Sequence, residues 1–168
     1  LRIPTLWLIL PLMFVGYAPS AGVRGLWIGP YMGDVFGLTV AQIGTVSLLM
    51  GIAMVAGSFA YGPLDRFFGT RKWVILIGNL LGAFACLAIW AAPESSVVTV
   101  TILVAALGLF GASFPALVAH GRSFFPPHLV GRGVTLMNLF GIGGVGVMQF
   151  ASAPFFSALS DTMAPAAA

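Results

Sequence analysis

The sequence predicts an all-α protein, a polytopic membrane bundle of about five transmembrane helices. Three observations predict this fold class. Of the 168 residues, 60% are hydrophobic and only 7% are charged, and the mean hydropathy is +1.07. A soluble domain carries roughly 25% charged residues, and a soluble core of this size could not bury so much apolar surface. The apolar residues also gather in long runs, separated by short segments that hold nearly all the charge.

Five of these runs are long enough to cross the hydrocarbon core of a bilayer, which takes roughly 20 residues of helix. They do not alternate as barrel strands do, and a helix satisfies its own backbone hydrogen bonds in lipid. The first span ends somewhere between Val23 and Gly33. We place the spans near residues 5–33, 41–61, 73–92, 97–119 and 133–159, in a single transmembrane domain that covers residues 1–168.

The segments that connect the spans alternate in charge. Basic residues precede the first span, separate the second from the third, and separate the fourth from the fifth, whereas the other connections carry acidic residues. Among the basic residues, only Arg24 departs from this pattern. The positive-inside rule then predicts a cytoplasmic N-terminus and two cytoplasmic basic loops. We expect a multi-pass protein of a bacterial-type cytoplasmic (inner) membrane.

Several classes of function do not fit this composition. The pI is near 9.6, but the seven basic residues sit between apolar runs and form no stripe for nucleic acid. The sequence has no nucleotide-binding signature, no Ser/His/Asp arrangement and no paired carboxylates. Its single cysteine, Cys86, lies inside an apolar run, away from any metal-ligand spacing. We therefore expect no enzymatic activity, no catalytic or metal-binding residue, no cofactor and no nucleic-acid partner.

The stretch GPLDRFFGTRKW, which starts at Gly62, is the most polar part of the chain. It resembles the cytoplasmic loop signature of the major facilitator superfamily, G-x-x-x-D-R-x-G-R-[RK], which joins the second and third helices of a six-helix half. The spacing departs from that signature, because two residues separate Gly62 from Asp65 and an additional Phe precedes Gly69. The matching residues are Gly62, Asp65, Arg66, Gly69, Arg71 and Lys72.

Two further stretches resemble the same family. FFPPHLVGRGVTLMNLFGIGGVG, which contains Arg132, is similar to a later loop and the glycine-rich helix after it, and GLWIGPYMGDVFGLTVAQIG is similar to the end of helix seven and the start of helix eight. The resemblance covers nearly the whole chain. It implies a major-facilitator-type half with about five of its six helices, and the loose loop signature favours the C-terminal half.

The charged loop has two interpretations. The resemblance implies a gating or conformational role for its residues and for Arg132, with the acid Asp65 latching the two halves of the transporter. The simpler interpretation is that the basic residues only set the topology, since they suit the anionic cytoplasmic leaflet. In either case, Gly62 and Gly69 permit tight backbone geometry, Pro63 suits a helix boundary, and Asp65 can accept hydrogen bonds at a helix start.

Arg24 is the leading candidate for contact with a solute. If the first span ends near Val23, Arg24 lies at the outer interface and snorkels; if the helix continues towards Asp34, Arg24 lies deeper and must face water, a partner or an anion. Ser113, in the fourth span, is a second candidate. Gln149 is a third, and it contacts either solute or a neighbouring helix.

Two sequence features concern the shape of the helices. Pro115 predicts a kink in the fourth span, which serves either gating or structure alone. Small residues in the fifth span predict close packing between helices. These residues are Gly141, Gly143, Gly144 and Gly146.

The sequence predicts secondary active transport of a small solute by alternating access, and Arg24 suggests that the solute is an organic anion. The expected partners are the lipid bilayer, the solute, and the missing transporter half or a second membrane subunit. One alternative remains open. Five helices cannot supply two halves, so the chain could instead be a non-transporting structural or accessory subunit of a larger membrane complex.

Overall fold

A computed structural model describes the backbone of residues 6–163. Arg2 and the side chain of Asp65 lie outside the described part, as do the side chains of residues 6, 155 and 157–163. The elements of the first two spans are α1 (Leu6–Gly16), α2 (Ala18–Gly22), the π-helical turn η1 (Val23–Trp27), α3 (Ile28–Phe36) and α4 (Val40–Phe68). The remaining elements are α5 (Arg71–Ala91), α6 (Val97–Gly111), α7 (Phe114–Arg122), the 3-10 turn η2 (Pro127–Leu129) and α8 (Val130–Met163).

These elements form five helical segments that are long and apolar enough to cross a membrane. The segments are Trp7–Phe36, Val40–Phe68, Arg71–Ala91, Val97–Arg122 and Pro127–Pro154. The predicted fold class, a helical membrane bundle with about five spans, is therefore confirmed. We number the spans one to five in this order.

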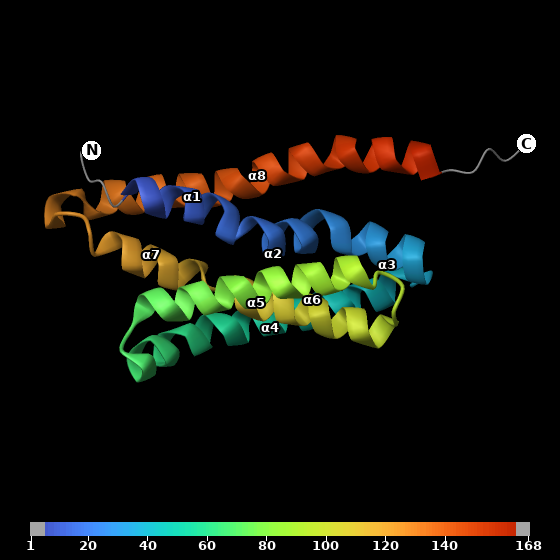
Figure 1. The fold of residues 1–168 in the computed structure, drawn as a ribbon, viewed down its shortest axis with the longest axis horizontal. Helices are drawn as coiled ribbons and strands as arrows, with labels where there is room; N and C mark the ends of the chain where they lie inside the picture. Colours follow the sequence, from blue (N-terminus) through green and yellow to red (C-terminus); the bar gives the residue numbers. More distant parts are fainter. Residues whose placement is uncertain (1–5, 164–168) are drawn as a thin grey trace, which may run out of the picture.

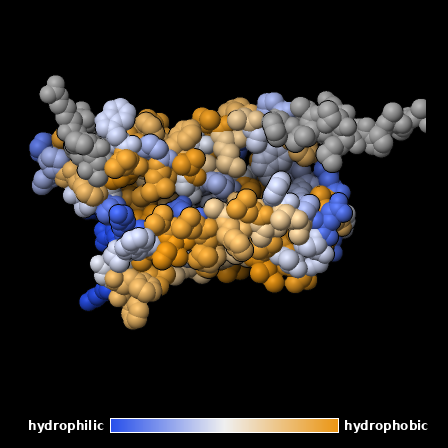
Figure 2. Space-filling view, viewed as in Figure 1, coloured by the Kyte–Doolittle hydropathy of each residue, from blue (hydrophilic) through white to orange (hydrophobic). Residues whose placement is uncertain are grey.

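The two ends of the bundle carry different charges. Figure 1 shows the α4–α5 and α7–α8 connections at one end, and the α3–α4 and α5–α6 connections at the other. The first end carries basic residues, including Arg66, Lys72 and Arg122, whereas Asp34 and Glu94 lie at the second. Hydrophilic residues gather at both ends of the space-filling view, and the middle is largely apolar (Figure 2). This banding matches a multi-pass protein in a bilayer.

Local sequence signals explain where the helices begin and end. Thr39 and Gln42 form a capping box at the start of α4, in which each side chain bonds the other residue's backbone N–H. Gly37 and Gly69 close α3 and α4 in the left-handed conformation, with φ of 63° and 61°. Glycine adopts this conformation at no steric cost, so both helices end there.

The second span is longer than predicted. We expected it to end near Tyr61, with Pro63 at a helix boundary, but α4 continues through Gly62 and Pro63 to Phe68. That expectation was wrong, because membrane helices tolerate proline when neighbouring groups satisfy the freed backbone carbonyl. At 29 residues, α4 is about 44 Å long, so it is tilted or reaches into the headgroup region.

The fourth span lies at the centre of the packing. Its first half, α6, packs against both α4 and α5, while α1 and α2 pack along α8 (Figure 1). The second half, α7, contacts α8 and α1 and so joins the two groups of helices. One buried cluster, around Met13 and Met137, lies towards the basic end, and a second, around Met32 and Met50, lies towards the acidic end.

Candidate functional site

The first span is not one regular helix. Helix α1 ends at Gly16, α2 covers Ala18–Gly22, and the chain then makes the π-helical turn η1 before α3 begins. A π-turn holds more residues per turn than an α-helix, and such turns occur frequently at functional sites. Arg24 lies in this turn.

Arg24 lies deep within the span. The helical path continues past it to Phe36, so the first span does not end near Val23. Counting 1.5 Å per residue, Arg24 is about 26 Å along the helix from Trp7 and about 18 Å from Phe36. A charged side chain at this depth is costly unless it faces water, a partner or an opposite charge.

An open groove separates the π-turn from α4, and Arg24 lines it. The Arg24 side chain is exposed, and the groove has a volume of about 610 Å³. The α4 side of the groove combines one hydroxyl group, on Ser47, with small and aliphatic residues. The residues from α4 are Ser47, Leu48, Gly51, Ile52, Met54, Val55 and Ala56.

Contacts with α8 hold the π-turn in place. The Trp27 indole N–H donates a hydrogen bond of 2.9 Å to the Ser152 hydroxyl, and the Trp27 ring lies 4.9 Å from the ring of Phe156. The Gln149 amide lies so close to Gly25 that a Cβ there would be 3.0 Å from Nε2. Gln149, on α8, therefore packs beside the turn that holds Arg24, although it is not among the residues that line the groove.

Ser113 lies elsewhere, in the interruption between α6 and α7. Its side chain is only 2% exposed, and its hydroxyl accepts a hydrogen bond of 3.3 Å from the Asn79 amide on α5. The same amide group donates to the Ile75 carbonyl at 2.8 Å. Sequence reasoning did not assign Asn79 to this contact. The sequence does hint at such a contact, because Asn79 is the one polar side chain in the interior of an otherwise apolar span.

The charged loop is mostly helical. Only Gly69 and Thr70 separate α4 from α5, so Arg66 falls in the last turn of α4, and Arg71 and Lys72 fall in the first turn of α5. The Arg71 guanidinium donates a hydrogen bond of 3.4 Å to the Ala119 carbonyl of α7. This contact joins the loop to the fourth span.

Other residues of the predicted loop set are exposed. Gly62 lies inside α4 with open space where a Cβ would stand, and Arg132 is in the first turn of α8. Both face outward at the basic end of the bundle. Among the residues that the structure describes, no three His, Cys, Asp or Glu side chains gather closely enough to hold a metal ion.

The four glycines of α8 have different surroundings. A Cβ on Gly144 would overlap the backbone of Phe14 in α1, and a Cβ on Gly141 would overlap the ring of Phe114 in α7. Gly143 and Gly146 have nothing within 4 Å of that position. Close packing thus depends on Gly141 and Gly144, which hold α8 against the first and fourth spans.

Comparison with known proteins identifies the family. The sequence profile of the Major Facilitator Superfamily matches residues 9–164. The chain belongs to this superfamily. The match runs through all five spans, and residues 62–72 lie where α4 ends and α5 begins, at the junction of the second and third spans.

One relative in the superfamily is Monocarboxylate transporter 2 of the rat, Rattus norvegicus. It is 32% identical to this chain over 125 residues, which cover 73% of the chain and 24% of the relative. The chain thus spans about a quarter of that transporter's length. No solved structure matches the chain.

Proposed function

We propose that this chain is part of a secondary transporter that moves a small organic anion across the membrane by alternating access. The observation that carries the proposal is the position of Arg24. It is an exposed cation deep in the first span, in a π-turn that lines an open groove. Cations are rare at this depth of a membrane span because they are costly to desolvate, and binding an anionic solute would offset that cost.

The chemistry of the groove supports a short carboxylate. A guanidinium group offers a planar pair of N–H donors that matches a carboxylate in bidentate geometry. Ser47 supplies a hydroxyl from the opposite wall, and aliphatic residues such as Leu48 and Val55 suit a small apolar body. The name of the rat relative, a monocarboxylate transporter, points to the same class of solute.

The proposed mechanism needs a second half of the transporter. Five spans are most of a six-helix half, and we assign the chain to the C-terminal half because its loop signature is loosely spaced. The second half, or another membrane subunit, then closes the groove around the solute. The loop at residues 62–72 lies at the basic end, which the positive-inside rule places in the cytoplasm together with the N-terminus.

Uptake into proteoliposomes tests this proposal. The full-length transporter is reconstituted, and the initial rate of uptake is measured with a radiolabelled short monocarboxylate over a range of concentrations. Arg24→Ala is compared with Arg122→Ala, which removes an exposed arginine at the end of α7. A charge-assisted hydrogen bond is worth about 1.5–3 kcal/mol, so Arg24→Ala should raise KM about tenfold to hundredfold.

The control and a neutral solute complete the test. Arg122→Ala should leave KM within about twofold, because it lies outside the groove. An uncharged analogue of the same size should be transported poorly by the wild type. An unchanged KM in Arg24→Ala would overturn the anion site. A folded full-length protein that moves no solute would favour the alternative of a structural subunit.

A further inference from the structure

The interruption in the fourth span leaves backbone carbonyls without their usual donors. Helix α6 ends at Gly111 and α7 begins at Phe114. In a continuous helix the Gly111 carbonyl would accept from residue 115, but that residue is Pro115, which has no N–H. At membrane depth a carbonyl without a partner is costly, so other groups must serve this region.

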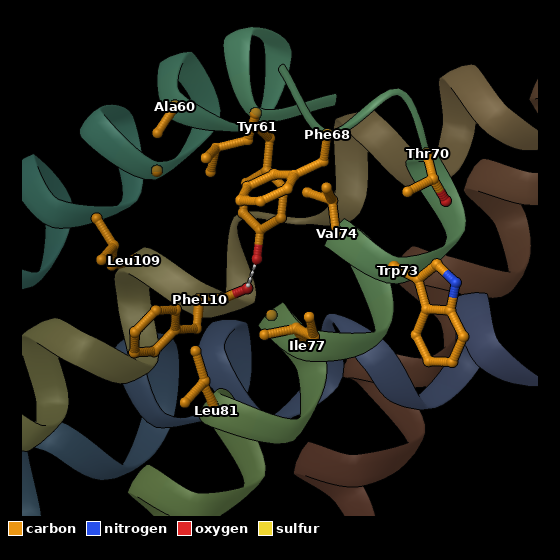
Figure 3. A pocket seen from close by; sticks show the side chains of 13 residues that line it. Ala60, Tyr61, Phe68, Thr70, Trp73, Val74, Ile77, Leu81, Leu109 and Phe110 are labelled. Carbon is orange, nitrogen blue, oxygen red and sulfur yellow. Dashed lines mark hydrogen bonds between the residues drawn. The ribbon is translucent and has the colours of Figure 1, made fainter. Parts of the chain in front are cut away.

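Tyr61 bonds the carbonyl one residue before Gly111, from a neighbouring helix. Its hydroxyl reaches across from α4 and donates a hydrogen bond of 2.8 Å to the Phe110 carbonyl, just before the interruption (Figure 3). The Tyr61 side chain is only 6% exposed. It stands at the wall of an apolar pocket of about 570 Å³ between α4, α5 and α6, where the other side chains that point inward are nearly all hydrocarbon.

Glycines make this reach possible. A Cβ on Gly78 of α5 would overlap the Tyr61 hydroxyl, and a Cβ on Gly57 of α4 would overlap the Leu109 carbonyl. The residue after Gly78 is Asn79, whose amide donates to Ser113 inside the interruption. Helices α4 and α5 therefore both bond the fourth span at the interruption, α4 through Tyr61 and α5 through Asn79.

We propose that Tyr61 is a positioning residue for transport. It fixes the bend of the fourth span and thereby sets the rate of the conformational step, without touching the solute. This inference rests on the proposed function in one respect, that the chain belongs to a working transporter. Any change in the bend must break or remake the hydrogen bond to Phe110. Because Gly78 leaves the space that the hydroxyl occupies, a side chain there should produce the same defect from the opposite helix.

The test compares two variants with two matched controls in the full-length protein. Tyr61→Phe removes the hydroxyl, and Gly78→Ala displaces it. Tyr31→Phe is the first control, because Tyr31 also donates to a backbone carbonyl, that of Pro93, at 2.6 Å but away from the interruption. Gly82→Ala is the second, because a Cβ there would meet only Phe110 Cβ, at an ordinary 3.8 Å.

The expected result is a split between two kinetic parameters. Tyr61→Phe and Gly78→Ala should lower the maximal uptake rate about three- to tenfold and leave KM within about twofold, as expected from losing one interhelical hydrogen bond. Both controls should keep the wild-type rate. Rates are divided by the amount of folded protein, so a merely structural defect would leave the normalised rate unchanged and overturn the proposal.

Hydrogen exchange gives a second readout that does not depend on transport. Amides of residues 108–118 should exchange faster in Tyr61→Phe and Gly78→Ala than in the wild type, and at the wild-type rate in both controls. If the wild type transports no solute, the proposed function fails on its own, and hydrogen exchange still decides whether Tyr61 holds the interruption. Unchanged exchange in Tyr61→Phe would contradict the inference.

Discussion

The first and fourth spans are both interrupted, yet they use their interruptions in opposite ways. In the first span the π-turn η1 presents Arg24 to an open groove. In the fourth span the break between α6 and α7 is enclosed, and Ser113 at its centre is buried and bonded to Asn79. An interruption alone therefore does not make a site. The first interruption leaves a cation, Arg24, exposed. In the second, neighbouring helices supply hydrogen-bond partners for the polar groups.

Helix α8 touches both interrupted spans. Gly144 lies against the backbone of Phe14, shortly before the first interruption, and Gly141 lies against the ring of Phe114, directly after the second. A methyl group added at Gly144 would press on backbone, whereas one added at Gly141 would press on a ring. Backbone moves aside less easily than a ring does. This difference makes α8 a useful place to test the comparison.

The largest effect should come from removing the π-turn. Deleting Leu26 takes one residue from η1, which rotates Arg24 by about 100° relative to Trp27 and its hydrogen bond to Ser152. The initial rate of monocarboxylate uptake should fall at least about tenfold, because either Arg24 leaves the groove or Trp27 leaves α8. Leu26→Ala keeps the chain length and should retain most of the rate. Wild-type uptake by the deletion variant would show that the turn does not position Arg24.

The next effect should be on stability, at Gly144. Gly144→Ala forces its methyl group into the Phe14 backbone and should lower the free energy of unfolding by about 1–3 kcal/mol. Gly143→Ala meets open space and should change it by less than about 0.5 kcal/mol. Thermal unfolding in detergent, followed by intrinsic fluorescence, measures both. Equal melting temperatures for the two variants would mean that α8 does not pack on α1 as described.

Gly141→Ala should cost less than Gly144→Ala. Its methyl group overlaps the Phe114 ring, and a side-chain ring can turn aside more easily than backbone can. We expect a loss of about 1 kcal/mol in the free energy of unfolding. A larger loss than that of Gly144→Ala in the same unfolding assay would reverse the order of rigidity that we assign to the two contacts.

The smallest effect on transport should come from Ser113→Ala. It removes the hydrogen bond from Asn79 and the side-chain contact with Tyr61, each worth about 0.6 kcal/mol in a membrane, and the Asn79 amide keeps its bond to Ile75. KM for the monocarboxylate should not change. Ser47→Ala, on the wall of the groove, should raise KM and is the matched serine variant. A raised KM in Ser113→Ala would place Ser113 in the solute pathway after all.

Much of the fold could be predicted from the sequence, because the signals involved are local. Long apolar runs set the five spans, and the alternation of charge singled out Arg24 before its depth was known. The end of the second span could not be predicted, since whether Pro63 stops a helix depends on its neighbours.

The details of the site depend on contacts between distant residues. The π-turn at Val23–Trp27 has no local signature, and it is accommodated by Gln149 against Gly25, more than a hundred positions along the chain. The hydrogen bonds of Tyr61 and Asn79 depend on the rotation of α4 and α5 about their axes. Unbroken apolar runs carry little information about that rotation, because nearly every face of such a helix is apolar.

The most direct test of the central claim is the accessibility of the two interruptions to water. Arg24→Cys and Ser113→Cys are introduced separately into a full-length transporter without other reactive cysteines, and both are treated with a charged, membrane-impermeant thiol reagent. We predict rapid labelling at position 24 and no labelling at position 113. Labelling at position 113 but not at position 24 would contradict the account.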